Sequence, residues 1–447
     1  DYSSVKGCMI IRPLGYALWE NIQRELDKKF KETGHENVYM PMFIPESLLQ
    51  KEKDHVEGFA PEVAWVTQGG KEELTERLCV RPTSETLFCE HYANIIKSYR
   101  DLPKLYNQWC SVVRWEKTTR PFLRSREFLW QEGHTVHATP EEAMEETKKM
   151  LNVYADFCEE ILAIPVIKGE KTEKEKFAGA ENTFTIEALM YDGVALQSAT
   201  SHYFGDNFAR AFNMKYMDKD NTEKYMYQTS WGITTRIIGA MIMTHSDDHG
   251  LVLPPNIAPT KVVIVPIGKN NVEVLDKSFE IAKGLQLRGV TCSIDNSEKS
   301  PGFRFAENEM KGIPIRVEIG PKDVENNLCV LVRRDTLEKI RVEIDNVEEE
   351  IIKLLADMQT EMFIRAKTRR DSMTRSVMTL SEMKASIEKQ NGFIKAYWCG
   401  DRSCEEKVKE EAGITSRCIP FNEDNADGKC CVCGKNATHL VYWGKQY

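Results

Sequence analysis

The sequence predicts an α/β (α+β) protein built from two or three domains. Its 447 residues are more than one compact hydrophobic core usually holds. Segments with apolar residues at helical spacing alternate with short β-rich runs up to about residue 250, and a strand–helix–strand pattern opens near residue 260. Cysteines gather near the end of the chain. We expect domains at residues 1–258, 259–365 and 366–447.

The first predicted element is a helix that starts at Pro13, since proline suits a first helical turn, and stops near Gly34. Its apolar residues recur at helical spacing: Leu14, Leu18, Ile22, Leu26 and Phe30. The apolar run from Val38 to Phe43 follows and favours a strand. Pro41 within it has no N–H for a strand ladder, so this strand is expected to end or to lie at an edge.

Later segments of the first domain are predicted from the same patterns. Strands are expected at 105–116, 184–187 and 194–198, and a helix with acidic residues in its first turn at 140–162. In the second domain we expect strands at 261–266 and 291–294 around a helix at 271–288, which is typical of a partly parallel sheet. A charged helix at 347–368 leads to the third domain.

Composition narrows the class of protein. The net charge of −9 argues against a general polyanion binder, although the basic run from Arg365 to Arg375 is either a local nucleic-acid contact or a solvated helix face. No apolar run approaches the roughly 20 residues of a membrane span, and the first residues do not resemble a secretory leader. The thirteen scattered cysteines fit a reducing compartment. We expect a cytoplasmic protein without a membrane partner.

Arginines and carboxylates alternate around a predicted turn between two strands. Arg114-Trp115-Glu116 is followed by a polar stretch and then by the run from Phe122 to Phe128, which contains Arg124. Arginines placed in this way bind phosphates or a carboxylate bidentately, and an aromatic ring stacks on a base. A lone Arg-x-Glu is more often a surface ion pair, so only the whole string indicates a nucleotide site.

That string resembles motif 2 of the class II aminoacyl-tRNA synthetases, whose loop bends over ATP. The helix that ends before Pro41 resembles motif 1, and Gly232 to Arg236 with the apolar run 237–243 resembles motif 3. The resemblance implies a catalytic domain with an antiparallel sheet, a dimer interface at motif 1 and therefore a homodimer. It also implies that Arg114 and Arg236 are the catalytic residues, with Arg236 against ATP.

Arg81-Pro82-Thr83-Ser84-Glu85-Thr86 resembles the Thr-x-Glu loop of the prolyl-tRNA synthetases, which binds the substrate amino group. Proline suits this pair, because its secondary ammonium has two N–H donors and a hydroxyl and a carboxylate accept both. Without that context, Thr-x-Glu is more often a helix-capping pair. The segments 128–134, 176–180 and 200–202 are also similar to this family.

The resemblance, which extends over nearly the whole chain, assigns two sets of binding residues. The proline-binding set is Thr83, Glu85, Arg114, Trp130, Glu132, His134, Phe177, His202, Ser230 and Gly232. The ATP-binding set is Arg114, Glu116, Arg124, Phe128, Gln197, Thr200, Thr235 and Arg236, with Mg²⁺ accompanying ATP. The implied reaction is that of a proline–tRNA ligase, which forms prolyl-adenylate and diphosphate and then charges tRNA(Pro). The 108 residues between Glu127 and Arg236 leave no room for a large editing insertion.

The third domain carries two cysteine pairs, Cys399-x4-Cys404 and Cys431-x-Cys433, separated by 26 residues. Four thiolates in two pairs can form a tetrahedral zinc site, but this spacing alone fits four buried or disulfide-bonded cysteines equally well. The chain is most similar to the eukaryotic and archaeal type of the family. This resemblance implies structural zinc on Cys399, Cys404, Cys431 and Cys433 in a small α/β domain.

The second domain resembles the mixed α/β anticodon-binding domain of these enzymes. Phe303, Arg304, Arg316 and Glu318 are candidate readers of anticodon bases. Two other functions remain open from the sequence: an inactive RNA-binding relative, and a synthetase of the same class for threonine, glycine or histidine. The intact arginines disfavour the first, and the absence of a polar side-chain reader beside the Thr-x-Glu loop disfavours the second.

Overall fold

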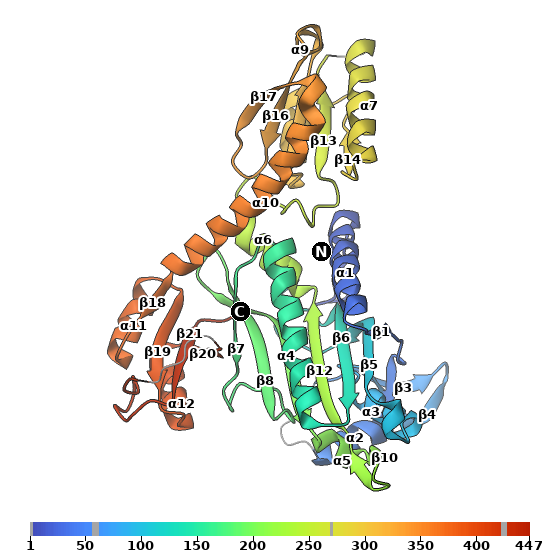
Figure 1. Ribbon diagram of the computed structural model, residues 1–447, viewed down its shortest axis with the longest axis vertical. Helices are drawn as coiled ribbons and strands as arrows, with labels where there is room; N and C mark the ends of the chain where they lie inside the picture. Colours follow the sequence, from blue (N-terminus) through green and yellow to red (C-terminus); the bar gives the residue numbers. More distant parts are fainter. Residues whose placement is uncertain (1–2, 56–61, 269–270, 422–426) are drawn as a thin grey trace.

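The computed structural model describes residues 3–55, 62–268, 271–421 and 427–447. Figure 1 shows a large unit that carries the N-terminal half, a smaller unit above it, and a third unit beside it that contains the C-terminal strands. Within the described ranges, no helix combines the length and apolar character that crossing a membrane requires. The mixed α and β class that the sequence predicts is confirmed.

The large unit is built on one mostly antiparallel sheet. Its strands are β1 (Glu36–Asn37), β5 (Lys104–Val113), β6 (Glu127–His137), β7 (Val166–Glu170), β8 (Asn182–Leu189), β9 (Ala195–Gly205) and β12 (Tyr227–Thr234). Smaller pieces are β2 (Phe43–Pro45), β3 (Trp65–Gly69), β4 (Glu72–Val80), β10 (Lys215–Met217) and β11 (Glu223–Tyr225). The helices are α1 (Pro13–Glu32), α2 (Glu46–His55), α3 (Glu85–Ile95), η1 (Tyr99–Asp101), α4 (Pro140–Asp156), which continues as η2 (Phe157–Ile161), α5 (Asn207–Ala211) and α6 (Arg236–His245).

Packing explains why these elements form. The predicted apolar face of α1 is buried at Leu18, Ile22, Leu26 and Phe30, whereas Leu14 stays exposed. The helices α1, α4 and α6 contribute to one hydrophobic core with β8, β9 and β12. This core leaves the other face of β6, β9 and β12 free to carry polar side chains.

The predicted strand 38–43 is wrong for most of its length, because only its last residue belongs to a strand, β2. Side chains take the backbone groups of Met40 that a ladder would use. Its N–H donates to Gln108 Oε1, and its carbonyl accepts from Arg81 Nη1 at 2.7 Å. The segment therefore connects two short strands without pairing as one.

The second unit has a five-stranded sheet in the order β14-β13-β15-β16-β17. Its strands are β13 (Val262–Pro266), β14 (Cys292–Ile294), β15 (Ile315–Ile319), β16 (Leu328–Arg333) and β17 (Lys339–Glu343). Its helices are α7 (Val272–Leu287), α8 (Pro301–Met310), α9 (Pro321–Glu325) and η3 (Ile344–Asn346). The expected strand–helix–strand is present, and β13 pairs in parallel with both β14 and β15.

Three of the four candidate anticodon readers, Arg304, Arg316 and Glu318, already form hydrogen bonds or ion pairs within this unit. Arg304 donates to the carbonyls of Asp295 and Pro266, and Arg316 is paired with Glu309 and Glu318. All three side chains are buried, and Phe303 alone of the four is exposed.

One long helix, α10 (Val347–Ser372), leaves the second unit and runs diagonally to the third unit in Figure 1. It passes through the expected domain boundary at 365/366 and ends four residues beyond the expected helix end. The basic run on it is a partly paired helix face: Arg365 pairs with Asp335 and Lys367 with Asp371.

The third unit contains β18 (Thr374–Ser376), α11 (Leu380–Lys389), β19 (Phe393–Trp398), α12 (Arg402–Ala412), β20 (Thr415–Pro420) and β21 (His439–Gly444). Its strands continue the sheet of the large unit, in the order β1-β5-β6-β12-β9-β8-β7-β20-β21-β19-β18. The junction is the pairing of β7 with β20, where Ile419 lies opposite Glu170 and Pro420 opposite Gly169. Two units that are far apart in sequence therefore share one sheet.

Candidate active site

A single cavity lies on the polar face of β6, β9 and β12. Its lining includes every predicted substrate-site residue except Thr235, which is buried at the start of α6. The residues shared by the lining and the prediction are Thr83, Glu85, Arg114, Glu116, Arg124, Phe128, Trp130, Glu132, His134, Phe177, Gln197, Thr200, His202, Ser230, Gly232 and Arg236. Trp130, Glu132 and His134 reach the cavity together because alternate residues of β6 share a face.

One end of the cavity is acidic. Glu85 is the first residue of α3, and its carboxylate accepts hydrogen bonds from Thr83 Oγ1 and from Ser230 Oγ at 3.4 Å. All three side chains are buried. The start of α3 has no side-chain capping bond, so Thr83 and Glu85 do not form the capping pair that was the alternative interpretation.

A second carboxylate, Glu132, lies beside Glu85 and is fixed from three sides. It accepts from the Ser84 N–H at 3.2 Å and from Gln108 Nε2 at 2.8 Å, and it pairs with His134 Nε2 at 2.8 Å. Burial opposes its charge, but the bonds from His134, Ser84 and Gln108 lower the pKa of Glu132. Burial also acts against the imidazolium, yet Glu132 raises the pKa of His134. This end thus holds negative charge in a buried place.

Flat side chains form the walls next to the acidic end. The ring of Phe177 lies 4.7 Å from that of His202, measured between centroids. Both nitrogens of His202 have partners at 3.0 Å, Thr183 Oγ1 and Thr200 Oγ1, and burial lowers the pKa of His202 to about 3. His202 is therefore neutral near pH 7 and acts as a wall without charge. Trp130, whose Nε1 donates to Cys110 Sγ at 3.2 Å, forms another wall.

The other end of the cavity carries three arginines. Arg114 Nε donates to the Pro82 carbonyl at 3.1 Å, and Arg236 Nε to the Leu123 carbonyl at 3.0 Å. Arg124 lies 3.9 Å from the carboxylate of Glu116. Burial, and then the charges of Arg114 and Arg124, lower the pKa of Arg236 to about 10. Like charges held together in this way favour binding of an anion that neutralises them.

Some residues of the site were missed by the sequence analysis. Thr234 lines the cavity where Thr235 was expected, a change that strand alternation accounts for, since β12 ends at Thr234. Thr183 lines it as the partner of His202. Gln108 lies behind the cavity, and its signal was weak: it is one glutamine in a predicted strand. Alternation along β5 places Gln108 on the same face as Cys110, and these two residues lie opposite Glu132 and Trp130 of β6.

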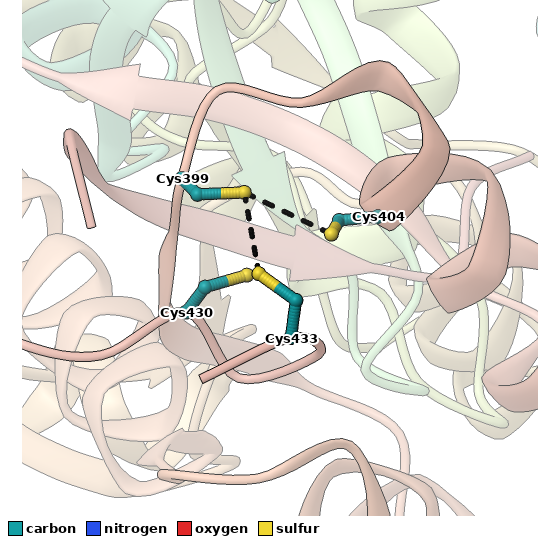
Figure 2. Close-up of side chains that lie close together, drawn as sticks. All are labelled: Cys399, Cys404, Cys430 and Cys433. Carbon is teal, nitrogen blue, oxygen red and sulfur yellow. Dashed lines mark hydrogen bonds between the residues drawn. The ribbon is translucent and has the colours of Figure 1, made fainter. Parts of the chain in front are cut away.

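Four cysteines of the third unit converge on one point, as Figure 2 shows. They are Cys399, Cys404, Cys430 and Cys433. The expected set is corrected in one member, because Cys430 takes the place of Cys431. Cys431 is buried in the core of this unit, where its N–H donates to the Tyr397 carbonyl at 2.9 Å.

The spacing of the sulfurs fits a tetrahedral metal. Cys399 Sγ lies 3.7 Å from both Cys404 Sγ and Cys433 Sγ, the contacts dashed in Figure 2. Four sulfurs bound to zinc at about 2.3 Å lie roughly 3.8 Å apart in a tetrahedron. Burial raises the pKa of Cys399 and of Cys404, whereas N–H groups of Cys433 and Val432 lower the pKa of Cys430 to about 7. Four sulfur donors at this spacing suit Zn²⁺, whose ligands are thiolates.

Three family models match successive parts of the chain. Residues 65–245 match the tRNA synthetase class II core domain (G, H, P, S and T), residues 261–354 an anticodon binding domain, and residues 380–447 the C-terminal domain of prolyl-tRNA synthetase. These matches follow the order of the three structural units.

Relatives that match the whole of this chain are proline–tRNA ligases. The chain is 66% identical to a proline–tRNA ligase of Clostridium novyi over 447 residues, which are all of this chain and 93% of the relative. It is 64% identical to the proline–tRNA ligase of Ruminiclostridium cellulolyticum and 63% identical to proline–tRNA ligase 2 of Bacillus thuringiensis, again over its full length and over 93% and 94% of theirs. These three relatives are bacterial.

Proposed function

The chain belongs to the prolyl-tRNA synthetase family, and we propose that the cavity on β6, β9 and β12 is where it activates L-proline with ATP. The enzyme is a proline–tRNA ligase, which forms prolyl-adenylate with release of diphosphate and then transfers proline to tRNA(Pro). One observation carries the assignment of the site: buried carboxylates occupy one end of the cavity and three arginines the other. A zwitterionic amino acid and a polyphosphate match these two ends.

Proline is recognised at the acidic end. Its secondary ammonium donates one N–H to Glu85 and the other to Thr83, and the nearby Glu132 adds negative charge in a site shielded from water. The pyrrolidine ring lies against Trp130 and Phe177. Ser230, Gly232, His134 and His202 complete this part of the lining.

ATP is bound at the arginine end. Arg114 holds the proline carboxylate and the α-phosphate together, while Arg124 and Arg236 bind the outer phosphates and Phe128 stacks on the base. Glu116, Gln197 and Thr200 supply polar contacts to the nucleotide. In this scheme the contact role of Thr235 passes to Thr234, and Thr235 supports the start of α6.

The reaction follows from this placement. A carboxylate oxygen of proline attacks the α-phosphorus, the bond to the β-phosphate oxygen breaks, and diphosphate leaves with the electron pair. The arginines stabilise the negative charge that develops on the phosphates, and no residue of the chain needs to form a covalent bond. Class II synthetases need Mg²⁺, which neutralises phosphate charge, and Glu116 is the lining carboxylate that would hold it.

In the second step the terminal ribose hydroxyl of tRNA(Pro) attacks the carbonyl carbon of prolyl-adenylate, and AMP leaves. The unit at 259–365, which contains the anticodon-binding match, would hold the other end of the tRNA. Phe303, exposed at the start of α8 with Lys299 Nζ 4.9 Å from its ring centroid, is the candidate that would stack on a base.

The third unit, 366–447, would bind one structural zinc ion on Cys399, Cys404, Cys430 and Cys433. Four protein ligands fill a tetrahedral shell, so zinc here would stabilise the fold and leave no position for substrate. The proposal rests on the sulfur spacing and on the convergence of four cysteines on one point.

We also infer that the enzyme works as a homodimer in the cytoplasm. Two parts of the motif 1 region expose large apolar side chains: Leu14 and Tyr16 at the start of α1, and Tyr39, Met42 and Phe43 beyond its end. Exposed apolar side chains of this kind favour a protein partner. None of the thirteen cysteines is joined in a disulfide within the described residues, which suits a reducing compartment.

The test is diphosphate exchange into ATP, measured with each of the twenty amino acids in the absence of tRNA. We expect exchange with proline and only background with threonine, glycine and histidine. Exchange with threonine alone would overturn the assignment of the acidic end, and no exchange with any amino acid would overturn the proposed activation step.

A further inference from the structure

Three buried charged side chains join the third unit to the large unit. Arg417, from β20, donates to Glu187 Oε2 through Nε at 3.0 Å and through Nη2 at 2.7 Å. Lys171 Nζ donates to the other carboxylate oxygen, Oε1, at 2.8 Å, and Thr185 Oγ1 donates to the same oxygen at 2.9 Å. The Glu187 side chain is 0% exposed and that of Arg417 is 2% exposed. Nothing in the sequence analysis predicted this cluster.

The cluster lies on the cavity face of the sheet. In the pairing of β8 with β9, Thr183 lies opposite His202, Thr185 opposite Thr200 and Glu187 opposite Gln197. Residues directly opposite in an antiparallel pair point to the same face. Since His202, Thr200 and Gln197 all line the cavity, Glu187 points toward its ATP-binding end.

Electrostatics connect the same carboxylate to the arginines. Glu187 is among the charges that raise the pKa of Arg236, opposing the lowering by burial, Arg114 and Arg124. Burial disfavours the charge of Glu187, but Arg417 and Lys171 lower its pKa, so the carboxylate stays ionised. Without Arg417, a fully buried anion would keep only Lys171 as its charged partner, and the loss of one partner of a buried pair is costly.

The C-terminal segment holds the neighbouring strand as well. The Ala195 N–H, at the start of β9, donates to the Lys445 carbonyl at 2.8 Å, and Gln446 pairs with Ala195 in an isolated bridge. Gln446 also accepts from Arg417 Nη1. Both strands that present Glu187 and Gln197 are thus anchored by the third unit.

We propose that Arg417 is a positioning residue for ATP: it fixes the ionised Glu187, which sets the place of Gln197 and the charge around Arg236. The third unit is then a working part of the activation site and contributes to it even before tRNA binds. This inference rests on the proposed function of the cavity. Thr83 and Glu85, at the acidic end, are carried by α3 and the residues just before it, and they have no contact with the cluster in the described structure.

The test compares Arg417→Met with Glu405→Gln in the full chain, using proline-dependent diphosphate exchange. Glu405 makes a matched control, because it too joins the units in a buried place: it accepts from Thr172 Oγ1 at 2.8 Å and from Ser416 Oγ. Ser416 precedes Arg417 on β20 but contacts Glu405 and Thr172, whereas Arg417 contacts Glu187. Both substitutions weaken the junction, but only Arg417→Met removes a partner of Glu187.

We expect Arg417→Met to raise the KM for ATP at least tenfold while the KM for proline changes less than twofold. Glu405→Gln should leave both KM values within twofold of wild type. Arg417→Lys keeps the positive charge but has fewer hydrogen-bond donors, so its KM for ATP should lie close to the wild-type value. If Arg417→Met does not fold, Glu187→Gln still predicts a rise in the KM for ATP with little change in the KM for proline.

An unchanged KM for ATP in folded Arg417→Met or Glu187→Gln overturns the inference, as does an equal rise for both substrates or the same rise in Glu405→Gln. These results leave the proposed function standing, since wild-type exchange with proline is measured in the same experiment. Absence of exchange in the wild type would instead overturn the proposed function.

Discussion

At the scale of single residues, Arg114 belongs to the arginine end of the cavity and also interacts with the carboxylates of the acidic end. Its pKa is lowered by burial, while Glu85, Glu132 and Glu116 favour its charge. Its guanidinium lies 5.3 Å from the ring centroid of Trp130, on the wall of the proline-binding end.

Arg114→Ala should reduce proline-dependent diphosphate exchange at least about a hundredfold, since it removes a donor to the charge that develops on the α-phosphate. The measurement is the exchange rate at saturating proline and ATP, with circular dichroism to verify the fold. Arg77→Ala is the control: Arg77 forms an exposed ion pair with Glu46, and such pairs contribute little. Wild-type exchange in Arg114→Ala would contradict its role.

The zinc prediction separates two adjacent cysteines. Cys430→Ser should lose bound zinc and melt at a lower temperature, because it removes one sulfur of the cluster. Cys431→Ser should keep its zinc, since Cys431 is not among the four cysteines whose sulfurs converge, although it too should lose some stability because it is buried. Zinc per chain is measured by atomic absorption on the purified variants. Zinc loss from Cys431→Ser alone would make Cys431 the ligand, and equal loss from both variants would contradict their separation.

Residue types in a family pattern predicted most of the cavity but not which of two neighbours faces it. Thr235 and Cys431 were each expected one position away from the residue that the structure places in the site, Thr234 and Cys430. Adjacent residues face different ways, and which one faces inward depends on where the strand or turn ends. A spacing pattern does not contain that information when both neighbours have the same chemistry.

At the scale of elements, close approach of β6 and β12 depends on Gly133. It lies opposite Trp231, and a Cβ built on Gly133 would overlap the indole ring. Trp231 fills the core on the face away from the cavity, so Gly133 allows β6 to present Glu132 and His134 on the other face.

Gly133→Ala should lower the free energy of unfolding by about 1–3 kcal/mol or more, the range for overpacking a core. Chemical denaturation followed by tryptophan fluorescence measures the change. Gly302→Ala, in α8, is the matched substitution: its Cβ would meet open space, and alanine favours a helix over glycine. A fall in stability of equal size in both variants would show that the Trp231 contact is not the cause.

Helices with a clear apolar period were predicted to within a few residues, as α1 and α7 show. The prediction of a strand at 38–43 was wrong because Gln108 and Arg81, which are distant in sequence, form hydrogen bonds with the backbone N–H and C=O of Met40. Similarly, α10 continues past the expected boundary because Met362 and Ala366 are buried along its packed side. Tertiary contacts decided these cases, and local patterns do not record them.

At the scale of the whole molecule, three buried histidines connect stability to pH. Burial lowers the pKa of His137 to about 4, of His202 to about 3 and of His245 to about 4, from 6.5. The unfolded chain therefore binds more protons than the folded chain below pH 6.5, and stability falls as the pH falls. His134, whose pKa is raised, acts in the opposite direction but is one residue against three.

The urea midpoint should decrease from pH 7 to pH 5, and His245→Asn should show a smaller decrease because it removes one of the three groups. Both proteins are unfolded in urea at pH 7, 6 and 5 under constant ionic strength. Equal midpoints at pH 7 and pH 5 for the wild type would contradict the prediction. A slope that His245→Asn leaves unchanged would exclude His245 as a contributor.

The order of the three units along the chain was predictable, whereas their connection was not. The pairing of β7 with β20 joins residues about 250 positions apart, and the contact of Glu187 with Arg417 spans 230. Both contacts depend on where α10 places the third unit relative to the large unit, and no local sequence pattern encodes that placement.

The shared sheet has a consequence for any shortened form of the enzyme. In the complete chain, β20 covers the backbone of β7 at Gly169 and Glu170. A chain cut after α10 would leave β7 as an open edge, with unpaired N–H and C=O groups and with Val166 and Ile167 beside them. Such an edge is a template for another strand, so truncated chains would join each other edge to edge and precipitate. The third unit thereby also keeps the enzyme from aggregating.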